Sequence, residues 1–257
     1  SISCTMLDLG WEVLALLVAA GFVAGFIDSI AGGGGLIGVP VLLLAGADPV
    51  TALATNKIQG LFGSASAAIS YARAGLVNPR RQLAPAAMAF AASVLGALAV
   101  SVLPTDLLRA ALPVLLIAIA LFFALKPGLD DLDRTERISP RLFMLTLAPA
   151  IGFYDGLLGP GAGSFYMLGF VMLAGYGVLR ATAHTKLLNL ASNCGGLLAF
   201  AFVASPWWGI GLMMGAAQFA GAQVGARLAA RVGARLIKPL LVVMTTAMAL
   251  RLMWDWI

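Results

Sequence analysis

The chain has 257 residues, of which 61% are hydrophobic and only 11% are charged, and its mean hydropathy is +0.99. This composition excludes a soluble globular protein and predicts an integral membrane protein. The net charge of +5 comes from basic residues between apolar segments, which is typical of a multi-pass bacterial membrane protein and argues against binding of nucleic acid.

Residues that commonly bind metals are scarce. His184 is the only histidine, and the two cysteines, Cys4 and Cys194, are far apart in the sequence. We therefore expect no metal, no other cofactor and no disulfide framework. The sequence also lacks a P-loop, so any use of ATP would require another chain.

The first apolar segment, from about Trp11 to Ala47, is interrupted by the four consecutive glycines Gly32 to Gly35. Each glycine inside a helix costs about 1 kcal/mol relative to alanine, so the helix is predicted to break here. Irregular backbone inside a membrane is tolerated where protein buries it or where it lines a cavity. The second arm is only roughly 18 Å long, which predicts a hairpin that dips into the membrane; two tilted crossings are the alternative.

Six further segments are long enough to cross a bilayer, which takes about 20 apolar residues. Three follow the first break, and three follow a second break in the other half of the chain. They run from about Val50 to Arg73, Leu83 to Leu103, Leu107 to Leu125, Leu179 to Ser205, Trp208 to Ala230 and Leu236 to Trp254.

The second broken segment, from about Arg141 to Gly177, begins a copy of the first half. An offset of 129 residues places Lys57 over Lys186 and Thr55 over His184. Paired, glycine-interrupted segments in corresponding halves indicate the substrate site of a transporter with inverted repeats. We therefore predict an all-α integral membrane protein with two inverted repeats, residues 1–129 and 141–257, joined by a cytoplasmic linker at 130–140. Each repeat is a glycine-broken hairpin followed by three transmembrane helices.

The orientation follows from the preference of Lys and Arg for the cytoplasmic side. The charges agree only if each hairpin returns to the side from which it came, so both termini are predicted to lie outside the bacterial inner membrane. The uncharged turn from Ser205 to Trp208 and all five tryptophans then also lie outside. The basic residues that mark the cytoplasmic loops are Arg73, Arg80 and Arg81, then Lys126, Arg134, Arg137 and Arg141, and finally Arg227, Arg231, Arg235 and Lys238.

The short helices after the two breaks are predicted to begin near Leu36 and near Phe165. Unpaired N–H groups and the positive end of the dipole make a helix N-terminus attractive to anions. Two such ends that met near the midplane would suit a small oxyanion. The alternative is that the glycines only allow close helix packing, but packing glycines are usually spaced. The residues of the breaks that we predict to bind substrate are Gly32, Gly33, Gly34, Gly35, Gly161, Gly163 and Ser164.

Lys57 and Lys186 lie at equivalent positions, about two turns into the helices that follow. A lysine inside a membrane costs at least about 2.5 kcal/mol, so each is predicted to face a cavity or a partner; snorkelling to the interface is the alternative. The polar neighbours predicted to complete the site are Asn56, Gln59, His184, Thr185 and Asn189, for which ordinary bonding between helices is the alternative.

Asp28 and Asp155 lie just before the two breaks. Burial favours the neutral form of a carboxyl group, so both are candidates for carrying protons. The alternative is that they are structural partners of Lys57 or Lys186. His184 is a third proton-coupling candidate because imidazole titrates near neutrality, although a hydrogen-bonded structural role is equally consistent.

The order of these motifs resembles the TauE/SafE sulfite exporter family of bacterial membrane permeases. The similarity is carried by Gly21 to Gly25 leading into the glycine run, by Leu36 to Gly46, by Ala54 to Lys57 and by Gly152 to Gly159. It covers nearly the whole chain and departs from the plain pattern at Pro160 to Ala162.

The resemblance implies a secondary transporter of a small sulfur-containing anion, either sulfite or an organosulfonate such as sulfoacetate. Proton coupling and alternating access are the default mechanism, and the partners are the anion, protons and the lipid bilayer. A small-anion channel is the first alternative. An intramembrane enzyme with Ser164 as nucleophile and His184 as base is a weaker one, because no Gly-x-Ser-x-Gly elbow surrounds Ser164. The protein is therefore predicted not to be an enzyme, and the sequence leaves its oligomeric state open.

Overall fold

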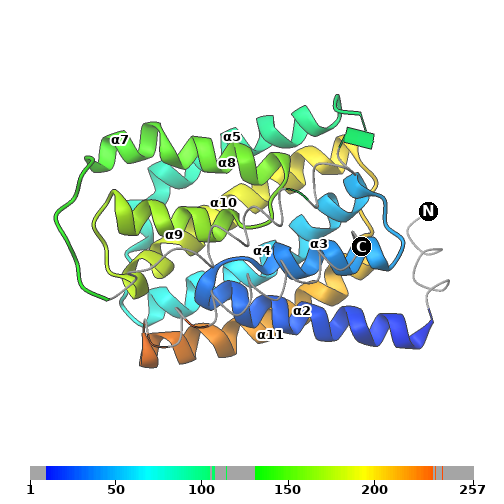
Figure 1. Cartoon of the computed structure of the whole chain (residues 1–257), viewed down its shortest axis with the longest axis horizontal. Coiled ribbons are helices and arrows are strands. Elements are labelled where there is room, and N and C mark those ends of the chain that lie inside the picture. The colour runs from blue at the N-terminus through cyan, green and yellow to red at the C-terminus, as the bar shows by residue number, and fades with distance from the viewer. Residues whose placement is uncertain are drawn as a thin grey trace.

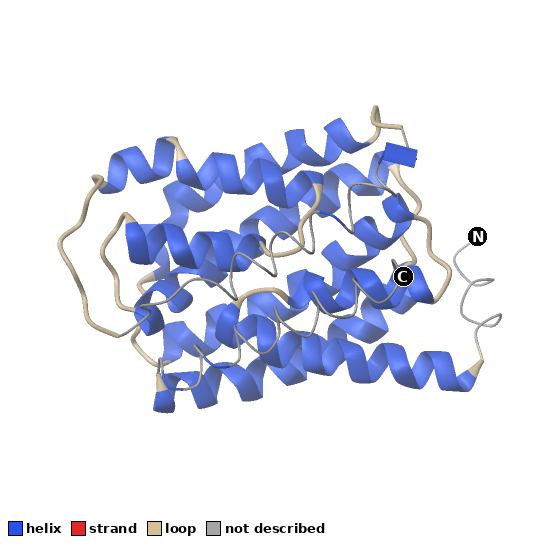
Figure 2. Ribbon diagram, viewed as in Figure 1, coloured by secondary structure: helices blue, strands red, loops and turns tan. Residues whose placement is uncertain are grey.

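The computed structural model of the protein describes residues 10–104, 106, 107, 114, 131–233, 235 and 239. This part of the chain folds into helices and contains no strand (Figure 2). The predicted spans Leu107 to Leu125 and Leu236 to Trp254 lie largely outside the described residues, as do both termini. The helices are α2 (Trp11–Ala31), α3 (Gly34–Leu44), α4 (Pro49–Arg73), the 3-10 helix η1 (Pro79–Gln82), α5 (Leu83–Val100), α7 (Pro140–Leu145), α8 (Leu147–Leu157), α9 (Ala162–Met172), α10 (Val178–Val203) and α11 (Trp208–Val232).

The helices α4, η1 and α7 start where the sequence supplies a capping residue followed by proline. The Asp48 carboxylate accepts hydrogen bonds from the N–H groups of Val50 and Thr51, both at 3.1 Å, and Pro49 begins α4. Proline fits the first position of a helix because it has no N–H group, and the first N–H groups of a helix have no partner within the helix. Asn78 before η1 and Ser139 before α7 act in the same way.

The described part of the chain contains three helices long and apolar enough to cross a membrane, namely Trp11–Ala31, Pro79–Val100 and Val178–Val203. α4 and α11 have 25 residues each and are long enough as well, at about 37 Å. They are less apolar because polar side chains such as Asn56, Gln59 and Gln218 face the interior. The predicted spans Val50 to Arg73, Leu83 to Leu103, Leu179 to Ser205 and Trp208 to Ala230 correspond to α4, α5, α10 and α11.

The second hairpin has a break that the hydropathy pattern did not predict. Its first arm is divided into α7 and α8 at Thr146, whose backbone leaves the helical region at φ −120° and ψ −68°. Pro149 explains the break, because it has no N–H to donate to the carbonyl of Leu145 and its ring crowds that carbonyl. The Thr146 hydroxyl instead donates to Leu142 O at 2.6 Å.

The two hairpins enter the bundle from opposite ends (Figure 1). α2 and α3 form one hairpin, which opens toward the end of the molecule where α2 begins. The second hairpin, from α8 to α9, opens toward the other end, where the linker joins α7. α4 and α10 run through the middle of the bundle and pack against each other.

Glycines allow each hairpin to lie in direct contact with a helix from the other half of the sequence. A Cβ atom on Gly25 of α2 would lie 2.0 Å from Gln218 O of α11. In the same way, a Cβ atom on Gly156 of α8 would lie 2.0 Å from Ser93 O of α5. Backbones that approach this closely gain van der Waals contact that larger side chains would prevent. The two halves are therefore interlocked.

Two clusters of buried apolar side chains lie at different levels of the bundle. One includes Leu53 near the start of α4 and Phe200 near the end of α10. The other includes Tyr71 near the end of α4 and Val178 at the start of α10. Because α4 and α10 are continuous helices, the residues between these levels form a separate layer. That layer, at 55–60 of α4 and 185–193 of α10, contains most of their buried polar side chains.

The charged linker also has a structural role, whereas its sequence suggested only a connection. Asp133 accepts a hydrogen bond of 2.7 Å from Gly177 N and pairs with Arg180 at 2.7 Å. Asp131 accepts from Leu179 N at 3.0 Å, so both carboxylates cap the start of α10. The bond from Gly177, followed by the Arg180 side chain, holds the pKa of Asp133 below its ordinary value.

Candidate functional site

The two glycine breaks touch each other inside the bundle. The Ser164 hydroxyl, at the start of α9, lies within 2.9 Å of Ala31 O and 2.8 Å of Gly32 O at the end of α2 and is placed to donate to them. Gly32 has φ +70°, and a Cβ atom there would lie 2.5 Å from the Gly163 carbonyl carbon and the Ser164 nitrogen. Only glycine fits this contact without movement of the backbone.

This contact predicts that Gly32→Ala is more damaging than an alanine at another glycine with positive φ. Gly46, in the exposed loop after α3, has φ +96°, and a Cβ atom there would have no other atom within 4 Å. Both substitutions incur the cost of the left-handed backbone, about 1–2 kcal/mol. Only Gly32→Ala also forces the breaks apart. We expect a clearly lower thermal unfolding temperature and loss of substrate binding for Gly32→Ala but not for Gly46→Ala; equal effects of the two substitutions would contradict the contact.

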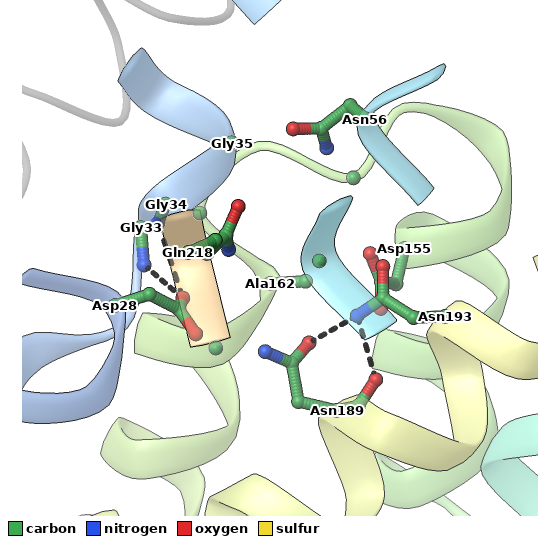
Figure 3. A pocket seen from close by; sticks show the side chains of 14 residues that line it. Asp28, Gly33, Gly34, Gly35, Asn56, Asp155, Ala162, Asn189, Asn193 and Gln218 are labelled. Atoms are coloured by element: carbon green, nitrogen blue, oxygen red, sulfur yellow. Dashed lines mark hydrogen bonds between the residues drawn. The ribbon is translucent and has the colours of Figure 1, made fainter. Parts of the chain in front are cut away.

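Asp28 occupies the N-terminus of α3. Its Oδ1 atom accepts hydrogen bonds from Gly33 N at 3.0 Å and Gly34 N at 3.1 Å (Figure 3). α3 therefore begins at Gly34, two residues before the predicted start, and its first N–H groups are already bound to a carboxylate. Lys186 donates to the carbonyl of Asp28, and its Nζ lies 3.6 Å from Asp28 Oδ2.

Asp155 has different partners in the second half. Its Oδ1 pairs with Lys57 Nζ at 2.6 Å, its backbone carbonyl also accepts from Lys57, and its Oδ2 accepts from the Ser192 hydroxyl. The lysine of each half is thus paired with the aspartate of the other half. Lys57, Lys186 and both aspartates are at most 5% exposed. In this conformation each aspartate is therefore the partner of a lysine, which is the structural alternative to a proton carrier.

A polar cavity lies between the two breaks (Figure 3). In the figure, Asp28 and the glycines of the first break lie on one side of it, and Asp155 lies on the other. Its volume of about 20 Å³ is room for about one water molecule, so the cavity is contracted around its polar groups. It is lined by Asp28, Gly33, Gly34, Gly35, Asn56, Gly60, Asp155, Gly159, Gly161, Ala162, Gly163, Asn189, Asn193 and Gln218.

The structure brings together about half of the residues predicted to bind substrate. Gly33, Gly34, Gly35, Asn56, Gly161, Gly163 and Asn189 line the cavity. The others are packed outside the lining: Gly32 and Ser164 join the breaks, Lys57 and Lys186 hold the aspartates, Gln59 bonds Asn56 at 2.8 Å, and Thr185 bonds its own helix.

His184 lies away from the central cavity. Its ring is 4.8 Å from that of Tyr176 and 5.7 Å from that of Phe170, measured between centroids, and its Nδ1 is 2.8 Å from Arg180 O. Instead it lines a second cavity near the start of α10. The arrangement does not pair His184 with Ser164, whose hydroxyl is bound to Ala31 and Gly32.

Sequence reasoning missed Gln218 and Ser192. Gln218 of α11 is 2% exposed, lines the cavity, and its Oε1 has no hydrogen-bond partner among the described residues. A glutamine near the middle of a predicted span was the available signal, but α11 belongs to neither break. In the sequence, Ser192 is an ordinary small residue of a membrane helix. Its hydrogen bond to Asp155 is visible only in the folded structure.

The four buried charges of the site sum to zero. Two lysines supply +2 and two aspartates supply −2, and the neutral carboxamides of Asn56, Asn189, Asn193 and Gln218 complete the polar lining. An anion that entered alone would leave one uncompensated negative charge in a buried site, at a cost of several kcal/mol.

Comparison with known proteins points to a membrane transporter. The sequence profile of the family described as "Sulfite exporter TauE/SafE" matches residues 17–252. The chain is 58% identical over 250 residues to "Probable membrane transporter protein ORF9" of Sinorhizobium sp., covering 97% of this chain and 96% of that protein. It is 46% identical over 243 residues to "Probable membrane transporter protein YfcA" of Escherichia coli K12, covering 95% and 90%. A "Probable membrane transporter protein" of Haemophilus influenzae is 40% identical over 249 residues, covering 97% and 98%. No solved structure matches the chain significantly.

Proposed function

Since this chain belongs to the TauE/SafE sulfite exporter family of membrane transporters, we propose that it is a secondary transporter of a small sulfur-containing anion, coupled to protons. The observation that carries the proposal is the meeting of the two glycine breaks at a buried polar cavity whose two aspartates are each paired with a lysine. Sulfite or an organosulfonate such as sulfoacetate is the proposed substrate class.

The Asp28 carboxylate supports anion binding because it already acts as an internal anion. It accepts two N–H groups at the start of α3 and lies near Lys186. A sulfite or sulfonate oxygen makes the same kinds of hydrogen bond. In the proposed mechanism the substrate competes with a carboxylate for a lysine and for helix N–H groups, and the cavity expands to admit it.

Proton coupling follows from the charge of the site. Protonation of Asp28 or Asp155 would free its lysine to pair with the substrate, and the four charges plus one singly charged anion and one proton again sum to zero, whereas a doubly charged anion would need two protons. Binding of the anion without the proton would leave a buried unpaired charge. The proposed stoichiometry is therefore at least one proton carried in the same direction as each anion.

Alternating access is proposed from the arrangement of the two halves. The hairpins enter from opposite ends (Figure 1). An apolar cluster lies on each side of the polar layer. We propose that the halves are inverted repeats, that both termini lie outside the inner membrane, and that each apolar cluster is a gate. A contracted cavity between two packed clusters favours a transporter over a channel, which requires a continuous pathway.

Uptake into proteoliposomes tests the proposal. Purified protein is reconstituted, and accumulation of sulfite, thiosulfate, sulfoacetate, sulfate and acetate is followed with an acidic exterior and with equal pH on both sides. We expect saturable, gradient-dependent accumulation of sulfite or a sulfonate, with at least about tenfold preference over acetate. Uptake that neither saturates nor responds to the pH gradient would support a channel instead.

A further inference from the structure

A second, larger cavity lies at the end of the bundle that carries the basic loops. Its volume is about 370 Å³, which is within the usual range for a small-molecule site. It is built by η1 and the start of α5, the linker into α7, the end of α9 and the start of α10. It therefore lies between residues 81–85 of the first half and residues 136–184, which belong to the linker and the second half.

The cavity combines arginines with an apolar wall. Arg81, Arg141 and Arg180 line it, and Glu136 is the one carboxylate in the lining. Arg180 is already paired with Asp133. Arg81 and Arg141 have no ion pair with any residue that the structure describes, and both are exposed at the surface. The side chains of Phe143 and Met144 contribute apolar surface to the same cavity.

One residue of the lining carries a buried polar atom without a hydrogen-bond partner. Gln82 lines the cavity and is 7% exposed, and its Oε1 has no hydrogen-bond partner within the described ranges. Its side chain makes no capping bond to α5, although it occupies the N-cap position. Buried polar atoms normally have a partner, and a carboxamide can present either its oxygen or its NH₂ group to one.

We propose that this cavity binds an amphipathic anion. A phosphate or sulfonate group would accept hydrogen bonds from the guanidinium groups of Arg81 and Arg141 and from the NH₂ group of Gln82, and its apolar part would lie against Phe143 and Met144. Two sources offer this chemistry, the headgroup region of an acidic phospholipid and a soluble organic acid. A basic pocket between membrane helices is suited to the first. The bound anion ties the start of α5 to the linker.

Hexyl phosphate is the test probe, because it has one phosphate group and a short apolar chain. Binding to the protein in phosphatidylcholine nanodiscs is measured by calorimetry, with empty nanodiscs subtracted. We expect Arg81→Gln/Arg141→Gln to weaken binding at least about tenfold. Arg80→Gln is the matched control, because Arg80 is the neighbouring exposed arginine outside the lining, and it is expected to bind as the parent does. Inorganic phosphate should bind at least about tenfold more weakly than hexyl phosphate, because it lacks the apolar chain.

Ala84→Phe provides a second variant that keeps both arginines and fills the cavity at an exposed position of α5. Binding of hexyl phosphate to this variant should also be lost. Parent-like binding by either the double variant or Ala84→Phe would overturn the site. Nanodiscs that contain phosphatidylglycerol identify the source: a lipid occupant would block the probe, whereas a site for a soluble acid would bind it unchanged. Because this binding is measured without transport, its result does not depend on whether the protein has the proposed transport activity.

Discussion

Lys57→Met is expected both to destabilise the protein and to weaken substrate binding at least about tenfold, equivalent to roughly 1.4 kcal/mol. Lys57 is 1% exposed and pairs with Asp155 at 2.6 Å, so its removal leaves a buried carboxylate without a cation. Loss of one partner of a buried pair typically costs about 3–5 kcal/mol. The same reasoning applies to Lys186 and Asp28.

The double variant Lys57→Met/Asp155→Asn separates the two effects. It removes the unpaired charge, so the thermal unfolding temperature should return most of the way to that of the parent. Substrate binding should stay weak, because the cation needed by the anion is still missing. Arg180→Met is the control for stability, since Arg180 and Asp133 form a surface pair with side chains about half exposed, and such pairs contribute only about 0–1 kcal/mol.

Binding of sulfite or sulfoacetate by Lys57→Met at parent affinity would show that the lysine is purely structural. Recognition would then rest on the amides of the breaks and on the carboxamides of the lining. Lys57→Arg is expected to rescue only in part, because guanidinium restores the charge but not the compact geometry of an ammonium group. Calorimetry and thermal unfolding in detergent measure both effects on the same samples.

The sequence was sufficient to predict most of the helices. Spans between loops were recognisable because apolar runs end at strong signals such as Asp48-Pro49 and Ser139-Pro140. The first glycine break was recognisable because four consecutive glycines cannot continue a helix at low cost, and the second because it is a copy of the first in the other half of the sequence. The extra break at Thr146 was missed because a single proline within an apolar run has only a local effect, which hydropathy does not register.

The pairing of charges could not be predicted from the sequence. Lys57 and Asp155 are 98 positions apart, and Lys186 and Asp28 are 158 apart. Repeat symmetry relates Lys57 to Lys186 and Asp28 to Asp155, but it does not say whether a lysine pairs within its own half or across to the other. That choice depends on how the hairpins pack against α5 and α11. Gln218 joins the site for the same reason, because α2 is in backbone contact with α11 there.

The charge balance of the site predicts that removing an aspartate affects binding in the opposite direction to removing a lysine. Asp28→Asn introduces a neutral side chain of nearly the same shape, and its carbonyl oxygen can still accept from Gly33 and Gly34. It leaves Lys186 uncompensated, as a permanently protonated Asp28 would. We therefore expect anion binding at neutral pH that is at least as tight as that of the parent and less dependent on pH below neutrality, whereas parent binding weakens as pH rises.

The same substitution should uncouple transport from protons. With the membrane potential held at zero, a pH difference of one unit stores about 1.4 kcal/mol per proton and supports about tenfold accumulation. Proteoliposomes with the parent protein should approach that ratio. At least one of Asp28→Asn and Asp155→Asn should fall to a ratio near one while still exchanging labelled for unlabelled anion.

His184→Gln is the control for this experiment, because His184 lines the second cavity and is separated from both aspartates. It should keep both accumulation and exchange. Undiminished accumulation in both aspartate variants would exclude these carboxylates as the proton carriers. Loss of accumulation in His184→Gln alone would indicate that proton coupling takes place at the end of the bundle that carries the basic loops. There the imidazole lies beside Tyr176 and Arg180.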